Sequence, residues 1–150
     1  MSLNIEADLP RGVAIATYFL GCAQDVQGNH ESALETLQQA HQSLLNLPDH
    51  PDVRMAARAL AAIGTVHEHL GNAAMALHTL EEAAGTLRDL GASHYEAQAR
   101  VTMADVVERT GGSRAAVRDH LQRALDVYEA GGSPEAEILR ERLAHLGSED

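Results

Sequence analysis

The sequence contains no lysine and no tryptophan, and only one cysteine and one phenylalanine among its 150 residues. Without lysine there can be no phosphate-loop lysine, Schiff-base lysine or lysine general base. A lone thiol, Cys22, excludes a disulfide framework and a cysteine zinc cluster. No apolar run reaches the roughly 20 residues that a membrane-spanning helix needs. These absences argue against an enzyme built on those groups and against a membrane protein.

The basic residues are few and of one kind. The 11 basic side chains, all arginine, stand against 22 acidic ones, which gives a formal net charge of −11. Such a charge repels phosphate backbones and anionic lipids, so we expect neither nucleic acid nor membrane as a partner. Arginine without lysine, together with abundant alanine, leucine and glycine, suggests a GC-rich bacterial genome.

One segment has some features of an export signal. Arg11 precedes the apolar run from Val13 to Leu20, and Leu20-Gly21-Cys22 is similar to the end of a lipoprotein signal. The run is short for a signal, and acidic residues lie where a signal carries positive charge. The sequence therefore favours a cytoplasmic protein.

Paired residues that begin with glycine recur along the chain and indicate a repeat. Gly28-Asn29 and Gly71-Asn72 are 43 residues apart, and Gly111-Gly112 follows 40 residues later. A period of this size is typical of repeat arrays. Small side chains at matching positions would let antiparallel helices approach closely. These positions hold Gly21, Gly64, Ala104, Ala33, Ala76, Ala116, Ala40, Ala83 and Ala124.

The segments between the glycines are rich in alanine, leucine, glutamate, arginine and glutamine, which favours helices throughout. Proline and glycine clusters mark the boundaries. We expect one all-α domain over residues 1–150. In the last helix, apolar side chains at helical spacing, Ile138, Leu139, Leu143 and Leu146, should cover the preceding one. The expected helices are 11–27, 30–47, 52–70, 73–90, 94–110, 113–130 and 134–146.

The pattern resembles the tetratricopeptide repeat. The resemblance rests on Leu20-Gly21, Ile63-Gly64 and Met103-Ala104 before the turns, and on the recurring alanines after them. It implies a right-handed α-solenoid of three hairpins, at about 11–47, 52–90 and 94–130, with a capping helix at 134–146. At one typically aromatic position the repeats carry Leu37, Leu80 and His120. The long period is similar to that of arrays in bacterial, especially actinobacterial, regulators.

Nine histidines raise the question of a metal site. In His67-Glu68-His69 the two imidazoles are two residues apart, so on a helix they point to different faces and cannot share an ion. The zincin spacing would need a histidine at position 71, which is Gly71. We therefore expect histidines that pack or cap, with no metal and no cofactor. The helical neighbours of Cys22 do not lower a thiol pKa, so no enzymatic activity is expected.

The resemblance implies that the first helix of each hairpin lines a concave groove. Asp25, Glu68 and Glu108 fall at equivalent positions there and form an acidic row, which should favour a basic protein or peptide. Tyr18 and Phe19 would hold its apolar anchor. The full candidate set is Tyr18, Phe19, Cys22, Asp25, Arg58, Thr65, Glu68, His69, Gln98, Thr102, Asp105, Glu108 and Arg109.

Two functions remain open at this point. The favoured one is a non-enzymatic protein-interaction module of a bacterial regulatory or signalling protein, with a peptide or protein domain in the groove. The alternative is self-assembly, in which the open face of the first helix docks on a second copy, because repeat arrays leave that face uncovered.

Overall fold

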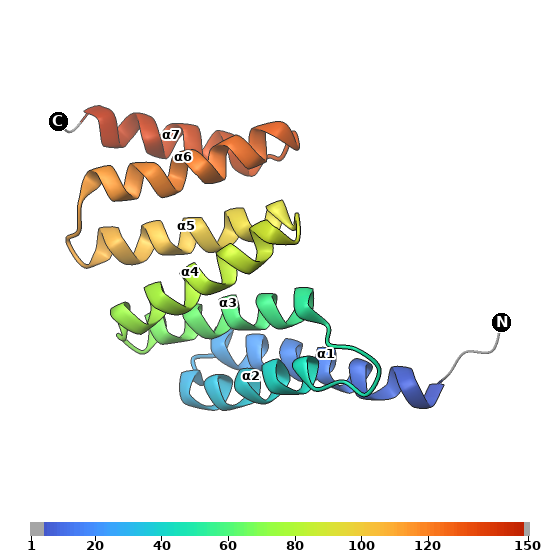
Figure 1. Ribbon diagram of the computed structural model, residues 1–150. Coiled ribbons are helices and arrows are strands. Elements are labelled where there is room, and N and C mark those ends of the chain that lie inside the picture. Colours follow the sequence, from blue (N-terminus) through green and yellow to red (C-terminus); the bar gives the residue numbers. More distant parts are fainter. Residues whose placement is uncertain (1–4, 149–150) are drawn as a thin grey trace.

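The computed structural model describes residues 5–148, and within this range the chain forms seven α-helices and no strand. Consecutive helices run antiparallel and stack from α1 and α2 at one end to α7 at the other (Figure 1). This confirms the expected all-α fold. The helices are α1 Ile5–Val26, α2 His30–Leu45, α3 Val53–His69, α4 Ala73–Asp89, α5 Ser93–Arg109, α6 Arg114–Ala130 and α7 Glu135–Ser148.

Each helix packs on the next, and α3 also contacts both α1 and α5. The odd-numbered helices of the three hairpins therefore share one side of the stack. The first helix begins at Ile5, earlier than the sequence indicates, and contains Pro10. None of the helices in the described range is long and apolar enough to cross a membrane.

The expected turns are glycine turns. Gly28, Gly71 and Gly111 have φ values of 89°, 83° and 73°, a region that only glycine enters without strain. In the first turn the amide of Gly28 donates to the carbonyl of Asp25, and the amide of Asn29 donates to that of Gln24. This pair of bonds ends a helix with its last carbonyls satisfied.

Inside the first two hairpins the backbones approach as the small residues predict. A Cβ added at Gly21 would lie 2.6 Å from Cγ of Leu37, and one added at Gly64 would lie 2.7 Å from Cγ of Leu80. Both leucines are fully buried. Each hairpin is therefore closed by a leucine that packs against bare backbone.

The third hairpin departs from the sequence alignment by one residue. The amide of Gly112 donates to the carbonyl five residues earlier, Val107, as the amides of Asn29 and Asn72 do in their turns. In those turns the asparagine itself is the N-cap of the next helix, whereas here one further residue, Ser113, is the N-cap of α6. Val117, 2% exposed, therefore takes the buried position expected for Ala116, which is half-buried. Leu121, rather than His120, is the buried leucine of this hairpin.

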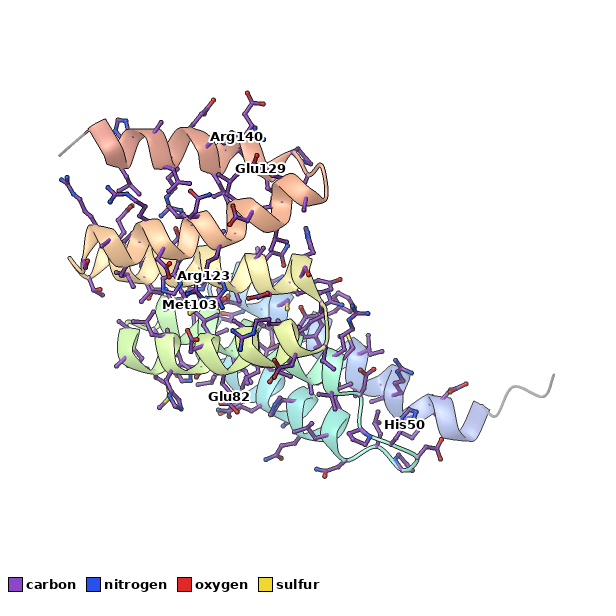
Figure 2. All side chains as sticks on the ribbon, turned by 45° about the horizontal axis from the view of Figure 1, so that its top comes forward. His50, Glu82, Met103, Arg123, Glu129 and Arg140 are labelled. Carbon is purple, nitrogen blue, oxygen red and sulfur yellow. The ribbon has the colours of Figure 1, made fainter. Side chains whose placement is uncertain are left out.

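Helix α7 covers α6 as expected, with one exception. Leu139 and Leu146 are buried in one cluster with Leu125 and Tyr128 of α6, and Leu143 packs against it. Ile138 is 66% exposed, so its predicted part in the cap is wrong. The face of α7 that covers α6 therefore includes Leu139 but not the adjacent Ile138. At the edge of this interface Arg140 lies near Glu129, with Nη2 3.4 Å from Oε2 (Figure 2).

Candidate groove between the odd-numbered helices

A hollow of about 370 Å³ lies on the shared side of α1, α3 and α5. Small residues of α3, Ala61 and Ala62, leave room for it, and leucines of the even-numbered helices close its floor. Its lining is Tyr18, Cys22, Asp25, Val26, Leu37, Arg58, Ala61, Ala62, Thr65, Leu80, Leu87, Tyr95, Gln98, Ala99 and Thr102. We call this hollow the groove.

Arg58 occupies the middle of the groove between two tyrosines. Its guanidinium carbon lies 4.2 Å from the ring centroid of Tyr95 on α5 and 5.5 Å from that of Tyr18 on α1. Each distance is within the range of a cation–π contact, which contributes roughly 0.5–2 kcal/mol. The contact joins all three hairpins through one side chain and holds both rings in place.

At the α1 wall, burial keeps two groups protonated. Desolvation raises the pKa of the Tyr18 hydroxyl to about 12, and the neighbouring Cys22 adds to the shift. Burial also raises the pKa of the Cys22 thiol. Because a thiol attacks as its thiolate, Cys22 is not an activated nucleophile.

Tyr95 is a groove residue that the sequence analysis missed. The signal was present, because Tyr95 precedes Gln98 by three residues and Thr102 by seven, which places all three on one face of a helix. The expected helix began at residue 94, so Tyr95 lay in its first turn and was not among the predicted groove residues.

Phe19 lies outside the groove, although its neighbour lines it. Consecutive residues on a helix project about 100° apart, and Phe19 is 55% exposed on the outer side of α1. The rings of Tyr18 and Phe19 meet edge to face with centroids 5.1 Å apart. Of the two residues predicted to hold an apolar anchor, Tyr18 therefore lines the groove, together with Tyr95, and Phe19 does not.

The remaining candidates lie beyond the groove, and with Asp25 on the groove wall they form a row of ion pairs along one end of the odd-numbered helices. Glu68, 7% exposed in its side chain, binds Arg109 of the next hairpin. Arg142 of α7 binds Asp105, with Nη1 2.7 Å from Oδ1, and also reaches Glu108. The acidic row exists, but each acid has a cationic or imidazole partner from the following repeat or cap.

The first member of the row differs from the others, because two histidines hold it. His30 Nδ1 lies 2.7 Å from Oδ1 of Asp25, and His69 Nδ1 lies 2.9 Å from Oδ2. The three side chains come from α2, α3 and α1. Sequence reasoning paired His69 with His67 and missed this cluster, since nothing in the local pattern brings residue 30 beside residue 69.

Comparisons with known proteins bear on the fold. No family model and no curated protein sequence matches the chain. Among solved structures, PcrH in complex with the chaperone binding region of PopB matches with a TM-score of 0.64 and 21% identity, over 90% of this chain and 94% of that one. PcrH from Pseudomonas aeruginosa gives a TM-score of 0.63 and 20% identity, over 90% and 89%. The likeness supports the tetratricopeptide-like helical repeat fold that the sequence indicates.

Proposed function

We propose that this chain is a protein-binding module that holds an extended segment of a partner protein in the groove. The observation that carries the proposal is the Tyr18–Arg58–Tyr95 arrangement, which spans three hairpins in a hollow of about 370 Å³. Aromatic rings and an arginine in a partly desolvated pocket are the groups that dominate binding energy at protein interfaces. The pocket offers them already ordered.

The structural neighbours add support to this proposal. One of them is a protein of similar fold in complex with a region of a partner protein, the chaperone binding region of PopB. Arrays of this kind present a continuous concave surface, to which a segment can bind along several repeats. The half-buried Cys22, whose thiol pKa is raised by desolvation, supports a binding role rather than a catalytic one.

The expected partner segment carries an apolar anchor and has basic character. The anchor would lie against Tyr18 and Tyr95, and Thr65 and Thr102 line the same hollow. The preference for basic partners now depends on the net charge of −11 rather than on the acidic row, whose members are paired. Net charge steers encounter, whereas the anchor determines residence. Because the long repeat period resembles that of arrays in bacterial regulators, we further propose that the chain acts in a bacterial regulatory or signalling protein.

A random-peptide display library tests the groove. Peptides selected on the full chain would be titrated against Arg58→Ala and Tyr95→Ala, and we expect affinity to fall at least about tenfold in both. The matched control is Met75→Ala, whose side chain is 51% exposed on α4 and does not line the groove. Affinity should also fall as salt rises, because charges are screened over about 8 Å at physiological salt.

Circular dichroism checks that the variants stay helical. Selected peptides that bind Arg58→Ala and Tyr95→Ala as tightly as the parent chain would place binding outside the groove. Peptides without an apolar anchor, or with an acidic consensus, would contradict the proposed partner chemistry.

A second candidate function is self-assembly through the outer face of α1. Leu9, Val13 and Leu20 are 63%, 57% and 55% exposed, and their spacing places them on one helical face. A second copy would cover this stripe. Light scattering at increasing concentration would show a dimer that Val13→Arg abolishes, and a parent chain that stays monomeric would remove this candidate.

A further inference from the structure

The cluster of Asp25, His30 and His69 has the composition of a metal site rather than of an ordinary ion pair. One ligand atom from each residue lies within 4.8 Å of the other two. Two imidazoles and one carboxylate are the donors that Zn²⁺, Co²⁺ and Ni²⁺ accept. From this geometry we propose that the chain binds one divalent transition-metal ion of the Zn²⁺ class here.

The atoms are close to the required spacing. The carboxylate oxygens of Asp25 lie 2.7–3.0 Å from the two Nδ1 atoms. Ligand bonds of about 2.0–2.2 Å in a tetrahedral site separate the ligand atoms by roughly 3.3–3.6 Å. An outward shift of about half an ångström therefore makes room for the ion. The imidazoles can make this shift, because their side chains are 30% and 40% exposed.

Burial and position favour a fixed site. The side chain of Asp25 is only 11% exposed, and each ligand is located at a helix end on a different helix. The ion would join the turn of the first hairpin to the end of α3. Three protein ligands leave the fourth position to water. Asp25 also lines the groove, so occupancy of the site would fix one groove wall.

The corresponding positions in the next repeat show why the site occurs once in the described part of the chain. There the acid is Glu68, the position of His30 is taken by Ala73, and that of His69 by Arg109. A guanidinium offers no lone pair to a metal. The next repeat of the same chain therefore provides residues that are compatible with this architecture and that cannot ligate a metal.

The test uses the full, tag-free chain after treatment with a chelator. Isothermal titration with Zn²⁺ should show one ion per chain and a raised melting temperature, since a metal that binds only the folded state stabilises it. Mg²⁺ prefers all-oxygen sites and should give neither effect. Co²⁺ should give the visible absorption of a low-symmetry site, which reports ligation directly.

Two variants copy the next repeat, and both should stay folded by circular dichroism. His69→Arg reproduces the pair of Glu68 with Arg109, and His30→Ala reproduces Ala73; each should weaken Zn²⁺ binding at least about tenfold. The control is His50→Ala, in the loop between α2 and α3 at the far end of the hairpin (Figure 2). Zn²⁺ affinity unchanged in His69→Arg and His30→Ala, or no Zn²⁺ binding by the parent chain, would overturn the proposal.

Discussion

The interior of the hairpins and the junctions between them follow different rules. Inside the first two hairpins the same contact recurs, a buried leucine against a glycine, as in Leu37 with Gly21 and Leu80 with Gly64. At the junctions the geometry recurs but the chemistry changes. Two histidines hold Asp25, whereas one arginine holds Glu68.

Packing explains this difference. A close contact between helices tolerates no added atom and no missing one, because interiors are packed as densely as crystals. A junction at the edge of the stack requires only an opposite charge or a hydrogen bond, and its partly exposed side chains can move. New chemistry can therefore be acquired at the junctions without loss of the fold.

The largest effect is expected where apolar packing joins the cap to the last hairpin. Leu139→Asp would bury a charge against α6, since Leu139 is 4% exposed, and should destabilise the protein by roughly 3 kcal/mol or more. Its neighbour Ile138 provides the control, because Ile138→Asp should change stability by less than about 0.5 kcal/mol. Urea unfolding measures both. Equal losses would mean that α7 does not cover α6.

The next largest effect tests the register inside the hairpins. Ala76 is fully buried, so Ala76→Leu should overpack the second hairpin at a cost of about 1–3 kcal/mol. Ala116 is only half-buried, because the inserted Ser113 shifts α6, and Ala116→Leu should cost clearly less. Thermal melts of the two variants decide the matter. A larger loss of stability in Ala116→Leu than in Ala76→Leu would favour the sequence alignment, which equates Ala116 with Ala76.

A smaller effect is expected at the second junction. Glu68→Gln removes the charge that binds Arg109, whose side chain is 60% exposed and therefore well screened, so the loss should be about 1 kcal/mol. High salt should reduce it further. Glu82→Gln, an exposed acid on α4 (Figure 2), is the control and should be neutral. A loss in Glu68→Gln that does not change with salt would show that shape, not charge, matters here.

The smallest effect concerns pH. Burial lowers the pKa of both His67 and His120, so the folded chain binds a proton there less readily than the unfolded chain. Their contribution to stability is therefore complete above the ordinary histidine pKa of about 6.5 and is lost as pH falls below it. The double variant His67→Gln/His120→Gln should show a weaker fall in melting temperature on acidification. An unchanged fall would assign the effect to other groups.

Local sequence predicted the parts of the fold that depend on local chemistry. Glycine spacing located the turns, and helix-favouring composition with proline and glycine breakers gave all seven helices of the described range. The one-residue shift of α6 was not predicted, because Gly111-Gly112 matches the other glycine turns and the extra residue, Ser113, comes only after them. In the groove, the resemblance to tetratricopeptide arrays predicted Tyr18, Arg58 and Phe19 together; Tyr18 and Arg58 line the hollow and Phe19 does not, because consecutive residues of a helix project in different directions.

The sequence by itself determined the helices, their antiparallel pairing and the small residues at their crossings, because backbone preference and side-chain size act over a few residues. Only the tertiary structure decided which charges meet. The pairing of Glu68 with Arg109, and the meeting of Asp25 with His30 and His69, depend on how each hairpin is placed on the next. That placement results from the summed packing of the buried leucines and alanines, and no local pattern encodes it.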